Sequence, residues 1–423
     1  MPPKKSGKQN KKLTIQQERV KADREATQKA IQDKNDHTLL DNEIAEREKV
    51  AAAERQEFEN KIALTRQIQE NFLPRFQKMP KVELHAHLSG SISRKTIEFL
   101  MNSDLKRAKQ ILSKYHLNEP KDMDRVFDTF GIIHEILEKP EALRVATLEM
   151  VRDFVKDGCV YLEIRTGPKN TPFMTKETYL KVVVDAVKEA QLEHPQIKVF
   201  LVISFDRSLV YEEANELLHL IGKFQLETNV IVGVELGGNP KLSGIHLLSI
   251  FQLARRFHGL GVTLHLAELE SQTDDVLDYL MMLPDRVGHG TFLHTNPKFV
   301  EMMSFYKIPL GEFICSENQN KVFILEICLS SNVYSKTVPS IHDSHFKYWK
   351  TKGVPLSICT DDKGVIPGAT LTEEYYKAAV AFSLTTADLI QINIDALRSS
   401  FAYKYNVTDL RDTWRKIHHN TLE

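Results

Sequence analysis

The chain has only four cysteines, and no two of them are spaced as a Cys-x-x-Cys pair. This argues against a thiolate zinc site or a redox motif, and it fits a reducing compartment, so we expect a cytoplasmic protein. No run approaches 18 apolar residues, which argues against a membrane-spanning helix. The formal net charge is only −1, so no overall field favours nucleic acid or a membrane surface as a partner.

The first 79 residues are poor in glycine and rich in charge. They contain 17 Lys and Arg, 13 Asp and Glu, and one glycine, Gly7. Their composition favours helix, but the apolar positions keep no clean heptad, so a coiled coil competes with a solvated or partly disordered arm. We therefore predict a charged helical or partly disordered extension at residues 1–79 and a separate domain at residues 80–423. The extension is a candidate for binding a partner protein.

After Pro80, short apolar runs alternate with helix-like stretches. Buried parallel strands read as continuous apolar runs, and eight such runs with helices between them suit a (β/α)8 barrel better than an open sheet. A doubly wound sheet is the competing fold, but no Gly-x-Gly-x-x-Gly follows an early strand. A longer helical insert, about residues 95–158, separates the first two runs. The runs cover residues 82–88, 160–165, 198–205, 229–237, 261–268, 286–290, 324–330 and 355–361.

Two histidines, His85 and His87, lie one residue apart in the first run, KVELHAHLSGS. Side chains alternate along a strand, so both imidazoles point the same way. The pattern is short and could equally be a polar stripe on a solvated strand. Whether it marks a metal site depends on further ligands at the ends of other strands.

Ionisable residues recur where the predicted strands end, and barrels of this kind build their active sites at the carboxyl ends of the strands. A single histidine there is more often a hydrogen-bonded polar group, but a set of such residues at one mouth favours catalysis. For Glu268 to join His265 in one site, the strand must end just after His265 and curl. The set comprises His85, His87, His265, Glu268, His289, Asp361 and Asp362.

Imidazoles with a carboxylate and no thiolate suit Zn²⁺ in a catalytic site. We expect one zinc ion with a position left for water, whose pKa the metal lowers. Its expected ligands are His85, His87, His265 and Asp361.

The remaining residues of the set suit acid–base roles. Glu268 is placed to donate a proton, and His289 to orient or deprotonate the water. Asp362 can hold the attacked group beside the metal. Together these features predict hydrolysis at an electron-poor carbon.

Five motifs resemble, in order, those of the adenosine/AMP deaminase family: KVELHAHLSGSI, VGVELGGNP, LHLAE, PDRVGHGTFL and SICTDDKGV. They are most similar to its adenosine deaminase-like branch, the N6-methyl-AMP deaminases, over about residues 75–420. The resemblance implies a zinc (β/α)8 barrel that hydrolyses the 6-amino or 6-alkylamino group of a purine. It implies the same four ligands, proton donation from Glu268 to purine N1, and water handling by His289. It also implies contacts from Asp362 to N7 and from the backbone NH of Gly238 to N3.

Ser89 bears on the choice of substrate. Adenosine deaminases carry an aspartate here that bonds the ribose 5′-hydroxyl and would repel a 5′-phosphate, whereas the N6-methyl-AMP deaminases carry asparagine. Serine is neutral and can donate to a phosphate, so the sequence favours N6-methyl-AMP, with adenosine as the alternative substrate. Thr166 and Lys169 could add phosphate contacts, although Lys169 could equally be an ordinary surface lysine.

Two other positions depart from the family pattern. Glu235 stands where the family usually has aspartate, a change that is tolerable if the side chain only buttresses the mouth. Residues 311–325 separate Ile-Pro-Leu from Glu-Ile-Cys-Leu, which the branch joins directly. We interpret the segment as a retained short intron, the alternative being a genuine loop that splits the seventh strand.

A protein of another kind is the third alternative, namely a non-catalytic scaffold that uses the helical arm. Only the 311–325 segment supports it, and the intact set of ionisable residues opposes it. Cytidine-type deaminases are excluded because they need a Cys-x-x-Cys. We expect a monomer that acts on a small purine nucleotide.

Overall fold

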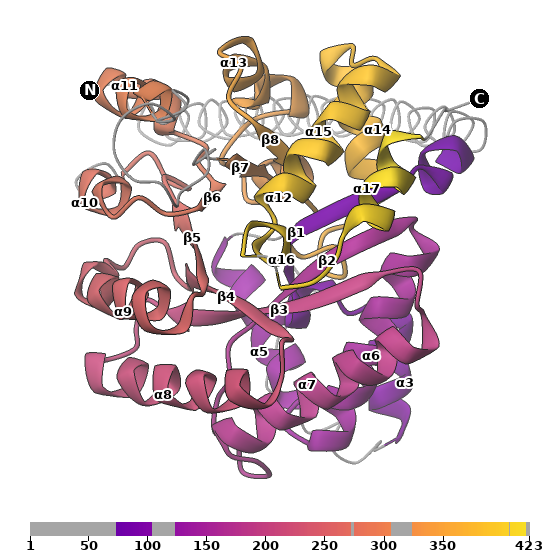
Figure 1. Ribbon diagram of the computed structural model, residues 1–423, viewed down its shortest axis with the longest axis vertical. Helices are drawn as coiled ribbons and strands as arrows, with labels where there is room; N and C mark the ends of the chain where they lie inside the picture. Colours follow the sequence, from indigo (N-terminus) through magenta and orange to yellow (C-terminus); the bar gives the residue numbers. More distant parts are fainter. Residues whose placement is uncertain (1–72, 104–122, 272–274, 306–323, 406, 420–423) are drawn as a thin grey trace, which may run out of the picture. The chain divides into compact units, whose positions relative to one another are not determined.

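The computed structural model describes residues 73–103, 123–271, 275–305, 324–405 and 407–419 (Figure 1). The chain divides into two compact units, Met1–Phe72 and Leu73–Glu423. The first unit, which is nearly all of the predicted arm, and most of the 311–325 segment lie outside the described residues. The second unit is described below.

Eight parallel strands form one sheet in the order β1 to β8, and the sheet nearly closes on itself. A parallel bridge joins Ala86 of β1 to Asp361 just after β8. There the amide of Asp361 donates to the His85 carbonyl at 2.8 Å. The predicted (β/α)8 barrel is confirmed. The strands are β1 (Lys81–His87), β2 (Cys159–Thr166), β3 (Lys198–Asp206), β4 (Ile231–Gly237), β5 (Gly261–Leu266), β6 (Arg286–His289), β7 (Ile324–Ile327) and β8 (Leu356–Ile358).

Helices cover the outside of the barrel, as the alternating pattern predicts. The helix α6, for example, buries Leu143, Met150 and Phe154 in the main hydrophobic core. The major helices are α3 (Arg94–Ser103), α5 (Met123–Ile136), α6 (Pro140–Lys156), α7 (Lys176–Glu193), α8 (Tyr211–Glu227), α9 (Leu248–His258), α10 (Val276–Met281), α11 (Pro297–Phe305), α12 (Leu329–Tyr334), α13 (Phe346–Thr351), α14 (Leu371–Phe382), α15 (Thr386–Ser399) and α17 (Arg411–His418). Short turns of helix are α2 (Leu88–Ser91), η1 (Ile245–Leu247), η2 (Leu293–Thr295), η3 (Ile341–Asp343) and α16 (Phe401–Lys404).

The ends of these helices follow from local sequence. Thr370 and Glu373 form a capping box at the start of α14, and Thr385 and Asp388 form another at α15. Gly259 ends α9 with a positive φ of 61°, the left-handed conformation that glycine adopts without penalty. These caps fix where each helix begins or ends. The site described below lies on the loops that follow the carboxyl ends of the strands.

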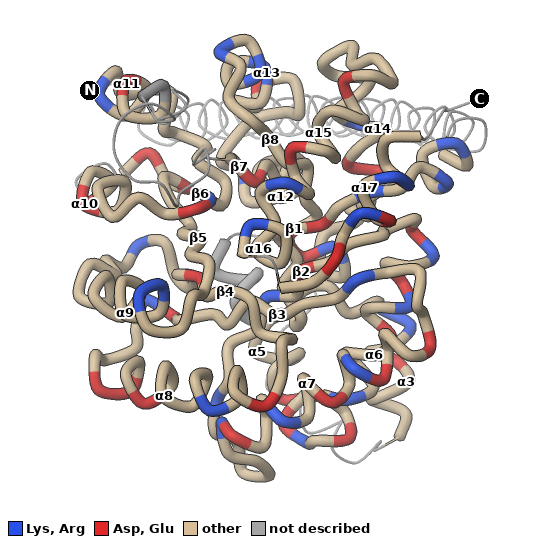
Figure 2. The backbone as a smooth tube through the Cα atoms, viewed as in Figure 1, with Lys and Arg blue, Asp and Glu red and all other residues tan. Residues whose placement is uncertain are grey.

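Charge on the outer helices is mixed. Lysine and arginine lie among aspartate and glutamate along α6 and α7, whereas α8 carries four glutamates and one lysine (Figure 2). Within the described residues, no helix is long and apolar enough to cross a membrane. Both observations agree with the balanced composition.

Candidate active site

Three predicted zinc ligands turn the same ring nitrogen away from the centre of the site. His85 Nδ1 lies 2.9 Å from Glu326 Oε2, and His265 Nδ1 lies 3.1 Å from the carbonyl oxygen of Leu236. His87 Nδ1 lies 3.6 Å from Glu235 Oε1. An Nδ1–H that donates outwards leaves the Nε2 lone pair available, which is how protein carboxylates and carbonyls orient metal-binding imidazoles.

Asp361 brings a carboxylate to these Nε2 atoms. Its Oδ1 lies 3.6 Å from His85 Nε2 and 3.4 Å from His87 Nε2, and its Oδ2 accepts from Ser331 Oγ at 2.7 Å. His85 Nε2 is buried and has no hydrogen-bond partner within the described structure. A buried polar atom without a partner costs free energy, and a cation between the imidazoles and the carboxylate would satisfy it.

Burial keeps the histidines in the form that binds a metal. It lowers the pKa of both His85 and His265 well below the usual range, and the nearby positive charge of Arg165 lowers it further. Both rings are therefore neutral at physiological pH, as metal ligation requires. The chemistry of these donors fits a zinc ion.

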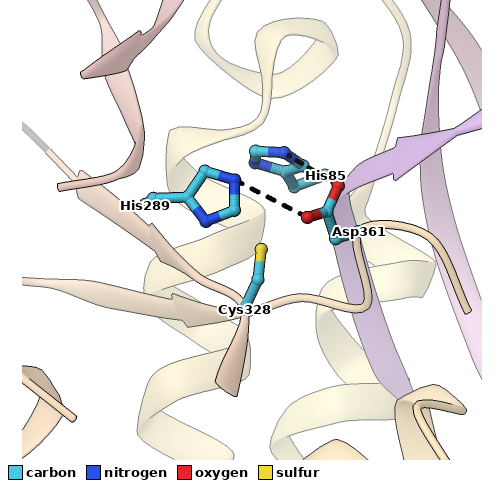
Figure 3. A group of neighbouring side chains, drawn as sticks. All are labelled: His85, His289, Cys328 and Asp361. Carbon is cyan, nitrogen blue, oxygen red and sulfur yellow. Dashed lines mark ion pairs between the residues drawn. The ribbon is translucent and has the colours of Figure 1, made fainter. Parts of the chain in front are cut away.

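Two overlapping groups of side chains could hold a metal ion among the described residues. One is His85, His87 and His265, and the other is His85, His289, Cys328 and Asp361. In Figure 3 the rings of His289 and His85 face the Asp361 carboxylate, with Cys328 beside them. Burial and the Asp361 carboxylate raise the pKa of the Cys328 thiol well above its usual range. Because a thiol binds zinc as the thiolate, the imidazoles and Asp361 are the better ligands.

Backbone strain concentrates at this mouth. Asp361, Ala267 and His289 have φ values of 59°, 49° and 57°, a region that residues other than glycine rarely adopt and that marks functional sites. Because β5 ends at Leu266 and Ala267 turns the chain, Glu268 reaches the same cavity as His265. The curl that the sequence requires is present.

The two acidic residues beside the ligands favour their protonated forms. Burial raises the pKa of Glu268, while His289 and Arg207 oppose the rise and Asp361 adds to it. Burial also raises the pKa of Asp362 well above its usual range, with further contributions from Asp361 and Glu235. Burial thus favours the proton-donating form of both groups, compared with exposed carboxyl groups.

His289 is fixed at both its ring and its backbone. Its Nδ1 lies 3.0 Å from Asn332 Oδ1, and its Nε2 lies 3.6 Å from Asp361 Oδ2. His345 Nε2 lies 2.8 Å from the His289 carbonyl oxygen. Because a carbonyl oxygen only accepts, His345 Nε2 carries the hydrogen of this bond. Asn332 and His345 were not identified from the sequence, because nothing near them in the chain marks them as neighbours of His289.

Beneath the histidines lies a layer of charged residues that the sequence did not reveal. Glu326 accepts from both Arg165 and Arg286, and Arg165 also donates to Glu235 at 2.5 Å. All four are fully buried. The sequence signal that could have revealed this layer is a charged residue within an otherwise apolar run, such as Glu163 and Arg165 in VYLEIR. Glu235 therefore does more than buttress the mouth, because its carboxylate also lies 3.7 Å from His265 Nδ1.

The predicted residues line two adjoining cavities. The larger, about 520 Å³, is bordered by Glu268, His289, Asp361 and Asp362. The smaller, about 300 Å³, is bordered by Thr166 and Lys169. His85 lies below the surface of both and borders neither. Residues that line both cavities are His87, Ser89, His134, Asp206 and Gly238.

Fold and cluster together place the protein among the metal-dependent hydrolases built on a (β/α)8 barrel. The sequence pattern of the family described as adenosine deaminase matches residues 80–417. The chain belongs to the adenosine deaminase family, and it is a hydrolytic purine deaminase.

Individual relatives agree with this assignment. An adenosine deaminase-like protein of Caenorhabditis elegans is 57% identical over 348 residues, which are 82% of this chain and 86% of that protein. The human N6-Methyl-AMP deaminase is 33% identical over 351 residues, or 81% and 94% of the two chains. A crystal structure of Arabidopsis ADAL complexed with GMP covers 80% of this chain and 97% of its own, with 27% identity and a TM-score of 0.69.

Proposed function

We propose that the protein hydrolyses the 6-substituent of a purine nucleoside monophosphate, with N6-methyl-AMP as the preferred substrate and IMP and methylamine as products. The observation that carries the proposal is the smaller cavity, which adjoins the larger one at Ser89 and is bordered by Lys169, a cation that a phosphate could contact. The name of the human relative and the GMP in the Arabidopsis structure support the same class of substrate.

His85, His87, His265 and Asp361 would hold a zinc ion, which would supply a water molecule with a pKa lowered to about 7. This set is supported by the clustering of His85, His87 and His265 and by the approach of Asp361 Oδ1 to the Nε2 atoms of His85 and His87. The rest of the chemistry falls to side chains of the chain itself.

Three side chains and one backbone amide would act on the purine and the water. Glu268, whose protonated form burial favours, would donate to N1, which makes C6 more electron-poor. Asp362, also protonated, would donate a hydrogen bond to N7, which accepts. His289, held through Nδ1 by Asn332, would present Nε2 to the attacking water and take its proton. The Gly238 amide would donate to N3.

Ser89, Thr166 and Lys169 would surround the phosphate. Two cations border the smaller cavity, Lys169 and Arg165, and Arg165 is already paired with Glu235 and Glu326. Burial and Lys169 lower the pKa of the neighbouring His134 to about 4, so that this imidazole is neutral at physiological pH. Burial lowers the pKa of Lys169 to about 8, against the opposing effect of Glu138 and Asp206, so the ammonium persists at neutral pH. The Thr166 hydroxyl shares a hydrogen bond of 2.7 Å with the Tyr179 hydroxyl. A hydroxyl can make more than one hydrogen bond, so Thr166 can also contact a ligand.

Adenosine is the second candidate substrate. The observation that favours it is the Asp206 carboxylate, which borders both cavities and would repel a phosphate placed against it. A nucleoside monophosphate would place its phosphate in the smaller cavity, whereas adenosine would place no charged group there.

The test compares N6-methyl-AMP, AMP, adenosine and N6-methyladenosine on purified protein with its zinc quantified. We expect N6-methyl-AMP to have the highest kcat/KM. Lys169→Met should lower kcat/KM for the nucleotides by about ten- to a hundredfold, the scale of a lost charge-assisted hydrogen bond, and leave the nucleosides unchanged. For the wild-type protein, kcat/KM for nucleotides should fall above about pH 8, where Lys169 loses its proton.

Controls separate the outcomes of this test. Asp361→Ala should abolish both zinc retention and turnover, whereas Lys188→Met alters an exposed lysine on α7 and should change nothing. A preference for adenosine, with Lys169→Met inert, would identify the protein as an adenosine deaminase. Absence of turnover with zinc bound would favour the scaffold.

Gly90 should be required for the position of Asp362. A Cβ at residue 90 would lie 1.6 Å from Asp362 Oδ1, so Gly90→Ala must displace the carboxyl group. We expect kcat/KM to fall by about ten- to a hundredfold, the scale of one lost hydrogen bond to the reacting ring. Steady-state kinetics would check this.

Gly259→Ala is the matched control for that change. Residue 259 has a φ of 61° and nothing within 4 Å of the added Cβ, so the substitution should lower the free energy of unfolding by about 1 kcal/mol without altering kinetics. Equal activity losses in both variants would show that Gly90 acts only on folding.

We also propose a cytoplasmic location, because Cys159, Cys328 and Cys359 are free and buried, as in proteins of reducing compartments.

A further inference from the structure

Two successive residues at the end of β6 have backbone conformations in the left-handed region. His289 has a φ of 57° and Gly290 has a φ of 63°. Glycine adopts this region without penalty, whereas a residue with a Cβ does not. The conformation of His289 therefore needs support from its surroundings. A relaxed φ would move its ring relative to Asp361, whose Oδ2 lies 3.6 Å from His289 Nε2 (Figure 3).

His345 supplies this support at the backbone. Its Nε2 donates to the His289 carbonyl oxygen at 2.8 Å, and both residues are buried. The carbonyl belongs to the peptide group that joins His289 to Gly290, so a hydrogen bond to it restrains the backbone of both residues. Asn332 acts at the other end of His289, through the contact with ring atom Nδ1. His289 is thus held at its ring and at its backbone by different residues.

His345 is itself held in place by packing. Its carbonyl oxygen accepts from the Trp349 amide at 3.1 Å, a bond that joins it to α13. The next residue, Phe346, is fully buried, and its ring stacks on that of Phe382 with 4.6 Å between the centroids. The hydrogen-bond donor is therefore carried by the packed start of a helix.

The polarity of the buried His345 ring serves this one contact. Burial lowers the pKa of the imidazole to about 3, against the opposing effect of the hydrogen bond to His289. The ring is therefore neutral at physiological pH, and its single hydrogen is the one on Nε2. His345 Nδ1 is buried and has no hydrogen-bond partner within the described structure. Because such an atom costs free energy, packing alone does not explain a histidine at this position.

We propose that His345 is a positioning residue, which holds the strained backbone of His289 so that the His289 imidazole faces the water to be deprotonated. The proposal rests on the proposed role of His289 as the base. His345 is not among the residues that border the two cavities. Its effect on the reaction must therefore pass through His289.

The test removes the donor while keeping the shape of the ring. His345→Phe should lower kcat by about ten- to a hundredfold with KM nearly unchanged, because a reacting group displaced by about 1 Å loses rate on this scale. The side-chain amide of glutamine can donate in place of Nε2, so His345→Gln should keep kcat within about threefold of wild type.

His294→Phe is the matched control. The His294 ring stacks beside that of His345, with 6.2 Å between the centroids. Within the described residues, no hydrogen bond joins His294 to His289. The control therefore makes the same change in the same group of side chains, and it should retain wild-type kcat and KM.

A double-mutant cycle shows what His345 acts through. In a His289→Gln background, His345→Phe should change kcat by less than about threefold, because no base is left to be positioned. An equal loss in both backgrounds would mean that His345 only stabilises the barrel. A loss in His345→Gln as large as that in His345→Phe would mean that the Nε2 hydrogen bond is not the cause. Either result would overturn the proposal.

Nuclear magnetic resonance of the imidazoles keeps this proposal separate from the proposed function, because it needs no turnover. In protein labelled with ¹⁵N at histidine, the His289 signals are those absent from His289→Gln. His345→Phe should shift them and speed the exchange of the Nδ1 hydrogen with water, whereas His345→Gln should not. If these changes occur without any deamination, the positioning holds and only the proposed function fails. If His345→Phe leaves the signals unchanged, the positioning is refuted even where deamination proceeds.

Discussion

Replacing Glu268 by glutamine should leave substrate binding nearly intact and lower kcat by about 10²- to 10⁴-fold, the usual contribution of a general acid. Glutamine has the same shape and can still donate a hydrogen bond to purine N1. It cannot transfer a proton, however, so the stabilisation that is lost belongs to the transition state alone. Steady-state kinetics should therefore show a fall in kcat with KM nearly unchanged.

The pH profile gives an independent signature of this role. A carboxylic acid donates only while protonated, so kcat/KM should fall as the pH rises through the pKa of Glu268. Burial raises that pKa, which moves the fall to a higher pH than an exposed glutamate would give. The Glu268→Gln variant should lack this alkaline limb, since it has no proton to lose.

Glu270→Gln is the matched control, because Glu270 is exposed two residues further along the same loop. It should retain wild-type kinetics and the wild-type profile. If Glu268→Gln keeps a tenth or more of kcat, another group supplies the proton and the proposed role of Glu268 is wrong.

Arg207 is placed to adjust this acid. Its guanidinium donates to the His265 carbonyl and lies over the Tyr279 ring, 5.8 Å from the centroid. Its positive charge opposes the effect of burial on the Glu268 pKa. Burial therefore favours the protonated form of Glu268, while the Arg207 charge favours release of the proton to the ring.

The sequence predicted those features of the fold and the site that leave a pattern within a short stretch of the chain. The strands were visible because burial on both faces makes each run apolar, and every residue of β4 and β5 is indeed buried. His85 and His87 were visible because alternation along one strand is local. The fold then brought the ends of β1, β5, β6 and β8 together, so ligand candidates could be chosen by position alone.

Contacts between distant segments were not visible in the same way. Glu326 reads as one charge in a short apolar run, and only the closed barrel brings it against His85, 241 positions away. His134 comes from α5, inside the helical insert, which the sequence did not connect with the mouth. Such pairings depend on register and closure, which no local pattern encodes.

Replacing Glu326 by glutamine should weaken both the fold and the metal site. Glu326 accepts from two fully buried arginines, Arg165 and Arg286, and receives the Nδ1 hydrogen of His85. Removing one charge from a buried ionic network typically costs about 3–5 kcal/mol of unfolding free energy. Losing the carboxylate that orients a metal-binding histidine typically lowers metal affinity about 10- to 100-fold.

Two measurements check this prediction. Urea unfolding gives the free energy of unfolding, and competition with a chelator gives the zinc dissociation constant. Zinc affinity should fall even at temperatures where the variant is fully folded, because the His85 ring loses the acceptor that sets its tautomer.

Glu163→Gln separates the two effects. Glu163 Oε2 lies 2.6 Å from Arg286 Nη2 in the same buried layer, and its Oε1 accepts from Tyr161 and from the Phe401 amide. Within the described structure it makes no hydrogen bond or ion pair to the four predicted ligands. We therefore expect Glu163→Gln to lose stability while keeping wild-type zinc affinity. If both variants lose zinc to the same extent, the buried charges act on the metal only through the stability of the barrel, and the orienting role of Glu326 is refuted.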